Sequence, residues 1–293
     1  MKNNFKHILL SGVILGSLAI SCVPDTIDGD GNGLAIKETV PANFTITETS
    51  PNRYRLEATE SNYITNRWKI GDDPFYTGKN VENIFIPDAG TYVIEHQATA
   101  QGGLIAGQSQ QTITVGKSDP MAGNLIQGGK FADANDHAKW SMAFPNPNET
   151  ASWTFSNGKA TFFAKKWDRN VLYQEIQVEA GRTYQADALV SSDTGVSESW
   201  FEIYVGYTKP TPNTDYSGDG ADNTWLRAIN TWANSGSSPF NGRISNVGSK
   251  NENNPDGTFT ATKTGTVYFA IRSGGNDYKG GISVTNVEFR GIN

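Results

Sequence analysis

Cysteine and histidine are nearly absent from this sequence, which has one Cys and three His among its 293 residues. These residue types supply most zinc, iron–sulfur and disulfide chemistry, so a zinc finger, an iron–sulfur site and a disulfide framework are excluded. Basic residues are also scarce, with 24 Lys and Arg against 30 Asp and Glu and a formal net charge of −6. A nucleic-acid partner needs a basic surface, so we expect no nucleic-acid binding.

Long helical patterns are missing as well, because no apolar repeat of helical period persists for more than two turns. Only 18% of the residues are charged, and the 31 Gly are accompanied by many Asn, Ser and Thr. This composition is typical of a turn-rich β protein rather than a helical bundle or coiled coil. Seven Trp and eleven Tyr form an aromatic surplus that calls for a role.

The first 21 residues have the pattern of an export signal. Lys2 and Lys6 precede an apolar run over residues 8–20 that is too short to span a bilayer comfortably. The following Leu18-Ala19-Ile20-Ser21-Cys22 resembles a bacterial lipobox, apart from Ala19 in the position usually taken by Leu. The resemblance implies that Cys22 becomes the lipidated first residue of the mature chain. The alternative is an ordinary signal peptide that leaves a free Cys.

Residues 22–35 are acidic and rich in Gly, which predicts a flexible tether. Acidic residues directly after the lipidated Cys resemble the surface-export signal of Bacteroidetes lipoproteins. Asp28, Asp30 and Asn32 also match the first half of a calcium loop, but Thr39 stands where the closing acid belongs, so calcium is not the favoured reading there. Removal of residues 1–21 deletes two Lys and no acid, which takes the net charge to −8.

Residues 36–116 read as a first β domain. Short alternating segments at 43–47, 53–58, 91–96 and 111–115 are separated by turn residues, which is typical of a sandwich. Trp68-Lys69-Ile70-Gly71-Asp72, Pro87-Asp88-Ala89-Gly90-Thr91-Tyr92-Val93 and Ile113-Thr114-Val115 resemble a polycystic-kidney-disease-type (PKD-type) repeat. The resemblance implies an immunoglobulin-like spacer with Trp68 and Tyr92 in its core.

A linker over residues 116–120 leads into a second domain over residues 122–293. About nine further short strand patterns occur there, a number that suits a jelly-roll β-sandwich. Three motifs resemble the jelly-roll type of carbohydrate-binding module. They are Asn124-Leu125-Ile126-Gln127-Gly128-Gly129 with Trp140 downstream, residues 172–184, and the closing Gly281-Ile282-Ser283-Val284-Thr285-Asn286-Val287-Glu288-Phe289.

The second domain is similar to the C-terminal modules of Bacteroidetes surface glycan-binding lipoproteins, including laminarin binders. The resemblance implies a non-catalytic protein of the outer membrane and cell surface that captures a neutral β-glucan. Its implied partners are a TonB-dependent importer and that importer's glycan-binding lipoprotein. No cofactor is expected. Ala132 and Thr285 replace acidic residues that help to hold a structural calcium in many such modules, so that metal is in doubt.

Sugar sites combine exposed aromatic faces, which cover the C–H face of a pyranose, with polar groups for its hydroxyl rim. Strand alternation in residues 200–206 places Phe201, Ile203 and Val205 inward and the other three side chains outward. The same argument applies to residues 184–188 and 267–272. The outward candidates for glycan contact are Trp200, Glu202, Tyr204, Asp187 and Arg272. The alternative is a solvated or loop-covered row.

The remaining tryptophans divide by context. Trp167 lies in a polar turn and is a candidate for sugar contact. Trp225 lies in a loop-rich segment over residues 209–256, on the opposite parity to Leu226 and Ala228, which are expected to point inward. Trp232 shares the inward parity, so it is a candidate contact only if a bulge intervenes. Trp140 and Trp153 are assigned to packing.

Catalysis is the less favoured reading. A retaining glycosidase needs two carboxylates about 5 Å apart, and jelly-roll glucanases carry acids at successive outward positions. Residues 198–202 offer Glu198 and Glu202 without the middle acid. A lyase would need a Tyr/His or Tyr/Lys pair, yet His137 is the only His of this domain and lies in a polar turn. The alternatives to glycan capture are therefore a protein-binding surface adhesin and an atypical glycosidase or lyase.

Overall fold

The computed structural model describes residues 39–61, 63–99, 104–144, 151–214, 216 and 223–292. The predicted signal peptide, the lipidated Cys22 and the acidic tether lie outside the described residues. The chain divides into two compact units. The first comprises the described residues up to Phe85 together with Thr91–Thr114, and the second comprises Ile86–Gly90 and the residues from Val115 onward.

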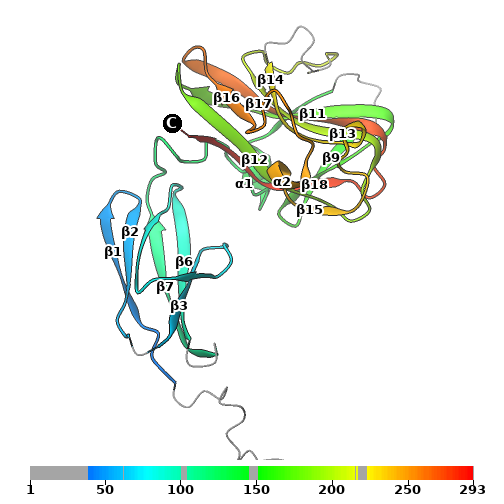
Figure 1. Ribbon diagram of the computed structural model, residues 1–293. Coiled ribbons are helices and arrows are strands. Elements are labelled where there is room, and N and C mark those ends of the chain that lie inside the picture. Colours follow the sequence, from blue (N-terminus) through cyan, green and yellow to red (C-terminus); the bar gives the residue numbers. More distant parts are fainter. Residues whose placement is uncertain are drawn as a thin grey trace, which may run out of the picture. The chain divides into compact units, whose positions relative to one another are not determined.

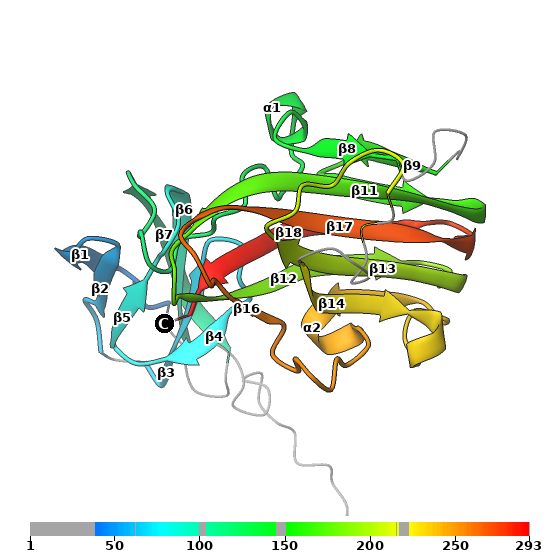
Figure 2. The same cartoon turned by 90° about the horizontal axis from the view of Figure 1, so that it is seen from above.

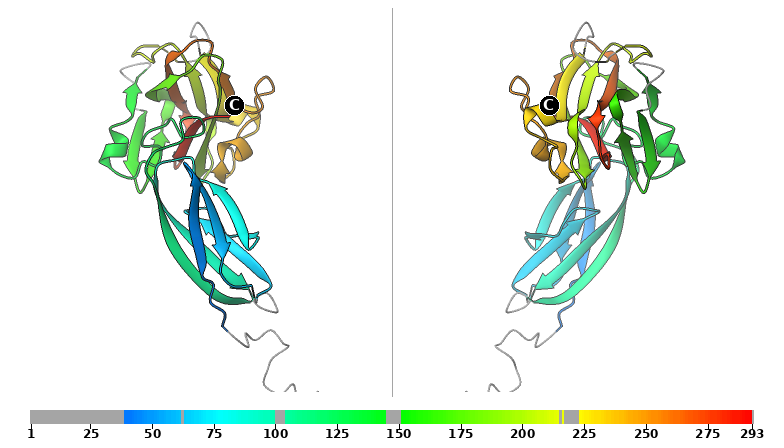
Figure 3. Two further views of the ribbon diagram at one scale, coloured as in Figure 1. Left: turned by 90° about the vertical axis from the view of Figure 1, so that its left-hand side faces the viewer. Right: turned by 90° about the vertical axis from the view of Figure 1, so that its right-hand side faces the viewer.

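The first unit is built from two antiparallel sheets, and its described residues contain strands and no helix (Figures 1 and 3). One sheet has the order β1-β2-β5 and the other has the order β4-β3-β6-β7. Two sheets joined in this order are typical of an immunoglobulin-like sandwich. The strands are β1 (Phe44–Ser50), β2 (Arg53–Ala58), β3 (Thr65–Ile70), β4 (Tyr76–Gly78), β5 (Val81–Phe85), β6 (Gly90–Thr99) and β7 (Ile105–Val115).

Trp68 lies at the centre of this first core. It is fully buried on β3, its indole N–H donates to the Lys79 carbonyl (2.9 Å), and the His96 ring stacks on it at 4.1 Å. Burial lowers the pKa of His96, which favours the neutral imidazole. The predicted core role of Trp68 is confirmed, whereas Tyr92 is only partly buried.

The second unit contains a six-stranded and a five-stranded antiparallel sheet. The six-stranded sheet has the order β15-β12-β18-β10-β9, with β16 also paired to β12, and it is formed by β9 (Ser152–Ser156), β10 (Lys159–Phe163), β12 (Thr183–Ser192), β15 (Phe240–Arg243), β16 (Thr258–Thr260) and β18 (Ile282–Gly291). The five-stranded sheet has the order β14-β13-β17-β11-β8, and it is formed by β8 (Ser141–Ala143), β11 (Lys165–Val178), β13 (Ser197–Gly206), β14 (Asn223–Asn230) and β17 (Gly265–Asp277).

The chain passes between these two sheets in jelly-roll order, since β10-β18-β12-β16 face β11-β17-β13-β14. Both predicted sandwiches are therefore confirmed at the level of an all-β fold. The side chains between the sheets form one apolar core that includes Trp140 and Trp153, as predicted. Short helical turns α1 (Ala134–His137), η2 (Thr231–Ala233) and α2 (Ile244–Val247) lie in the connections.

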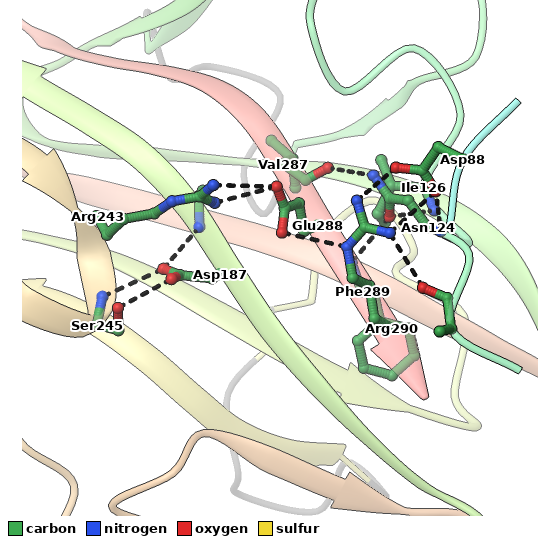
Figure 4. Close-up of polar contacts among 12 residues, drawn as sticks. Asp88, Asn124, Ile126, Asp187, Arg243, Ser245, Val287, Glu288, Phe289 and Arg290 are labelled. Atoms are coloured by element: carbon green, nitrogen blue, oxygen red, sulfur yellow. Dashed lines mark hydrogen bonds and ion pairs between the residues drawn. The ribbon is translucent and has the colours of Figure 1, made fainter. Parts of the chain in front are cut away.

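Asn124, the first residue of the quoted opening motif, fastens the start of the second unit to its last strand. Its side-chain N–H donates to the Val287 carbonyl (2.9 Å), and its side-chain oxygen accepts from the Phe289 N–H (3.0 Å). Both bonds satisfy backbone groups of β18 (Figure 4), so the motif has a structural role. Among the described residues there is no helix with the length and apolar character needed to cross a membrane.

Candidate functional site: an indole cluster at one end of the five-stranded sheet

The face of the five-stranded sheet that points away from the core carries most of the predicted site. Phe201, Ile203 and Val205 are fully buried in the core, which confirms the predicted alternation in β13. The strands β14, β13, β17, β11 and β8 lie side by side (Figure 2). Their register places three outward rows across the sheet: Asn230, Trp200, Gly274 and Arg169; Ala228, Glu202, Arg272 and Val171; and Trp225, Tyr204, Ala270 and Tyr173.

A register shift in β14 corrects the expected parity of this strand. Ile203 pairs with Arg227, and the next residue, Tyr204, pairs with Trp225, so Leu226 is skipped and points into the core. Ala228 was expected inward with Leu226, and that expectation was wrong, because Ala228 pairs with the outward residue Glu202. One extra residue in a strand reverses the alternation beyond it.

Three indole rings gather at the end of this outward face. The Trp232 ring stacks on Trp167, with centroids 6.1 Å apart and planes 22° apart, and lies 6.3 Å from Trp200 at 41°. Trp167 is 49% exposed, Trp232 is 58% exposed, and Trp200 is partly buried. We call Trp167, Trp200 and Trp232 the indole cluster. Large apolar rings exposed side by side are uncommon on a soluble protein without a ligand or partner.

The backbone bends sharply to bring Trp167 into the cluster. Lys165 pairs with Asp277 and Asp168 pairs with Gly275, so Lys166 and Trp167 bulge out of the ladder between them. Both bulged residues have positive φ, at 58° and 68°. The left-handed backbone conformation is unfavourable for residues that carry a Cβ. Proteins often retain it where the position of a side chain matters for function. The bulge is therefore conformationally unfavourable, and it directs the Trp167 side chain out of the strand ladder.

Gly274 provides the surface beneath Trp200. A Cβ at this position would lie 2.6 Å from Trp200 Cζ2 and 2.6 Å from the Arg169 Cβ, so a residue with a side chain cannot be accommodated without displacement. Sequence reasoning missed this residue. The available signal was the Gly274-Gly275 pair inside an apolar strand pattern, since a Gly within a strand marks a bulge or a close approach.

An ion pair lies under the same indole. Arg272 Nη1 is 2.8 Å from Glu202 Oε2, both side chains are 11% exposed, and the guanidinium carbon is 4.9 Å from the centroid of the Trp200 ring. The Tyr204 hydroxyl donates to the same carboxylate (3.3 Å). Burial raises the pKa of Glu202, and the attraction of Arg272 opposes that shift. The pair thus forms a charged but shielded base for Trp200.

The far end of the outward face is covered by protein. The chain that follows β13 crosses to the β8 edge, where the Asn213 N–H donates to the Phe144 carbonyl (2.9 Å) (Figure 2). Tyr216 is 3% exposed and packs edge-on against Tyr204, with centroids 6.4 Å apart. At this end of the outward face the loop-covered alternative that the sequence left open is the one observed. Glu202, Tyr204 and Arg272 point outward as predicted but are only 8%, 8% and 9% exposed.

Trp225 lies at this covered end and not in the indole cluster. Its ring is partly buried and packs against the group of Tyr204 and Tyr216. The indole N–H of Trp225 donates to the Arg227 carbonyl (3.2 Å). The backbone carbonyl of Trp225 accepts from the Asn251 side chain (3.1 Å). The connection between α2 and β16, which contains Asn251, is therefore attached to the sheet at Trp225.

Asp187 lies on the other sheet. It points away from the core on β12, as the alternation predicted, and accepts from the Ser245 hydroxyl (2.9 Å) and the Ser245 N–H (3.2 Å). Figure 4 shows this carboxylate beside the ion pairs of Glu288 with Arg243 (3.1 Å) and Arg290 (3.2 Å). Arg290 also pairs with Asp88 (2.6 Å), which belongs to this unit. Sequence alternation could not distinguish the two outward faces of a sandwich.

The residues at the questioned calcium positions make ordinary backbone contacts. The Thr285 hydroxyl donates to the Lys130 carbonyl (3.2 Å), and the Ala132 N–H donates to Asp136 Oδ2 (2.8 Å). In the part of the chain that the structure describes, no group of three or more His, Cys, Asp or Glu side chains is arranged to hold a metal ion. That these positions hold no structural calcium stays a prediction.

No protein-family model matches the chain, and no curated protein matches it. Among solved structures, the chain is similar to a carbohydrate-binding module of the β-sandwich superfamily, at 13% identity and a TM-score of 0.32, over 86% of this chain and 98% of that one. A module bound to β-1,4-galactotriose is 12% identical over 58% of this chain and 99% of that one, with a TM-score of 0.33.

An enzymatically active domain of a tailspike protein from bacteriophage CBA120 is 11% identical over 58% of this chain and 21% of that one, with a TM-score of 0.35. Similarities at these values carry no functional conclusion. The architecture itself defines the class: the chain is an all-β protein of antiparallel sandwiches, and its second unit is a jelly roll with an exposed indole cluster.

Proposed function

We propose that the second unit binds a polysaccharide at the indole cluster and does not cleave it. The observation that carries this proposal is the gathering of Trp167, Trp200 and Trp232 at one end of the outward face, with two of the rings about half exposed. Indole faces cover the C–H face of a pyranose, whereas a surface of Asp, Arg and Gln alone stays too well hydrated to gain affinity.

The proposed ligand is a neutral β-glucan of the laminarin kind. The net charge of −8 after removal of residues 1–21 would repel alginate or sulfated polymers. The module resemblance described from the sequence motifs supports a glucan of this class. Binding without cleavage is supported by the state of Glu202, because its carboxylate is held by Arg272 and Tyr204 under the indoles and is 8% exposed.

Affinity electrophoresis of the full mature protein against a panel of polysaccharides tests this proposal. Migration should be retarded in gels that contain laminarin and unchanged in gels that contain alginate or a sulfated glycan. Retardation by no glycan at all would refute the proposal and favour the protein-binding adhesin. Release of reducing sugar from any glycan of the panel would refute the non-catalytic role and favour the glycosidase or lyase alternative.

We further propose that lipidated Cys22 anchors the protein in the outer membrane, with the domains displayed at the cell surface beyond the tether of residues 22–35. A captured glycan would then be passed to a TonB-dependent importer and the importer's glycan-binding lipoprotein. The sequence pattern around the lipobox-like segment supports this location.

Replacement of Cys22 by Ser should abolish membrane attachment, since a hydroxyl cannot form the thioether that carries the lipid. We expect the wild type in the membrane fraction and labelled by radioactive palmitate, and the variant unlabelled and absent from that fraction. Ser21→Ala, one residue earlier, is the matched control and should remain attached. Palmitate labelling of the Cys22→Ser variant would contradict the proposed anchor.

We propose that glycan capture needs no metal ion. Ala132 and Thr285 offer no carboxylate at the two positions that would hold calcium, and hard cations such as calcium prefer charged oxygen ligands. Dialysis against a chelator should therefore change neither the melting temperature nor the affinity for laminarin. A fall in melting temperature that added calcium restores would show that a structural calcium is bound after all.

A further inference from the structure

The geometry points to Trp232 as a displaceable cover over Trp200, one that a sugar ring replaces when glycan binds. The inference rests on the proposed function and assigns different roles to the three indoles. The sugar packs on the faces of Trp167 and Trp200. The Trp232 ring occupies the sugar's place while no glycan is bound. The Trp200 indole N–H is then a donor to a sugar hydroxyl.

Trp232 has the position that such a cover needs. Its ring lies in contact with both partners, 6.1 Å from Trp167 and 6.3 Å from Trp200, measured between centroids. A fused aromatic ring system and a pyranose both present a flat apolar face of similar width, so each can occupy the same place against another indole. In the ligand-free protein the ring thereby shields apolar surface that would otherwise face water.

Trp232 is also the most exposed member of the cluster. It is 58% exposed and lies on the single turn η2 (Thr231–Ala233), which has no buried residue. The backbone of that turn is fixed, because the Asn230 side chain accepts from the backbone N–H of Trp232 (3.0 Å). The ring can therefore change rotamer while the backbone of the turn stays in place, and it then gives up its contacts with the other two indoles.

Trp200 is held much more firmly. Its ring lies over Gly274, with the guanidinium of Arg272 at 4.9 Å. Arg272 is in turn fixed by Glu202 (2.8 Å), so a displacement of Trp200 would disturb a buried ion pair. The difference in attachment means that an incoming ligand would move Trp232 and leave Trp200 in place.

The Trp200 indole nitrogen supplies an independent observation. Its Nε1 atom is buried and makes no hydrogen bond to any of the described residues. A buried donor without an acceptor is costly, and proteins retain few of them. A sugar that replaced Trp232 against the ring face would satisfy the N–H if one of its hydroxyls reached past the ring edge into the plane of the indole, where the N–H points. The free state thus carries a penalty that binding removes.

The decisive test is the sign of the effect of Trp232→Ala on affinity for laminarin, measured by calorimetry on the full mature protein. Removal of a cover spares the ligand the work of displacing it, so we expect affinity to rise by about threefold to tenfold. Trp167→Ala, in the same cluster, should instead lower affinity. Weaker binding by Trp232→Ala, with wild-type binding intact, would overturn the cover and leave the proposed function standing.

A second variant, Trp200→Phe, tests the role of the N–H without relying on Trp232. Phe keeps an aromatic ring and removes the unpaired donor, so the melting temperature should stay level or rise while laminarin affinity falls about tenfold. Wild-type affinity in this variant would overturn the hydrogen bond to the sugar. Absence of laminarin binding by the wild type itself would instead refute the proposed function, and this inference with it.

Discussion

Trp167→Ala is expected to lower affinity for laminarin by about tenfold to thirtyfold, or about 1.4–2 kcal/mol, while the melting temperature changes by no more than about 2 °C. The ring is 49% exposed on a bulge and contacts Trp232, which is also exposed, so its removal takes little from the folded state. The same exposure makes it the ring most available to a sugar. Calorimetric titration and a thermal melt measure the two effects.

Tyr76→Ala is the matched control for this substitution, because it also removes an exposed aromatic ring (38% exposed) but lies on β4 of the first unit. Its affinity for laminarin should equal that of the wild type. A fall of more than about 6 °C in the melting temperature of Trp167→Ala would contradict the account, since it would assign the ring to packing and not to ligand contact.

Arg272→Met is expected to cost about 3–5 kcal/mol of unfolding free energy, the largest effect on stability among these variants. The substitution leaves the Glu202 carboxylate buried without its partner, 2.8 Å from where the guanidinium had been. It also removes the cation beneath Trp200. Urea unfolding followed by tryptophan fluorescence reports on this unit, because Trp68 is the only one of the seven Trp in the first unit.

Lys209→Met is the control for the loss of an ion pair as such. Lys209 pairs with Glu175 at 3.2 Å, but the two side chains are 51% and 55% exposed, so the expected cost is below about 1 kcal/mol. The double variant Glu202→Leu with Arg272→Met should recover much of the lost stability, because no unpaired charge remains. An Arg272→Met variant as stable as Lys209→Met would show that the buried pair is not needed to hold the sheet face.

The pH dependence of the Arg272→Met variant has a definite sign. Burial already raises the pKa of Glu202, and loss of the Arg272 cation raises it further. The folded state then binds a proton more readily than the unfolded state, so stability falls as pH rises from the ordinary glutamate value of 4.5 through the higher folded value. The deficit of the variant should therefore shrink as the pH is lowered to about 4.5.

The sequence was informative where alternation is regular. In β13 the inward set of Phe201, Ile203 and Val205 and the outward set of Trp200, Glu202 and Tyr204 could both be predicted, because one face of the strand packs against a core. Strands β3, β4, β5, β8 and β15 were missed, since three to six residues of mixed polarity carry little periodic signal.

The composition of the site depended on features that no local pattern records. The bulges at Trp167 and in β14 decide which indoles meet, and a bulge reverses parity without changing the composition of the segment. Tyr216 covers Tyr204 through a contact between residues that are separated in the chain. The sheet that each strand joins separates Asp187 from Glu202 and Arg272, and this follows from topology alone.

Titration of the seven indole N–H resonances with a soluble laminarin oligosaccharide, followed by ¹H–¹⁵N NMR, tests the central claim most directly. We expect the Trp167, Trp200 and Trp232 signals to shift with one common affinity, while the signals of the buried Trp68, Trp140 and Trp153 stay unchanged. The Trp200 signal should move as its N–H gains an acceptor. If the oligosaccharide binds and these three signals stay in place, the indole cluster is not the glycan site.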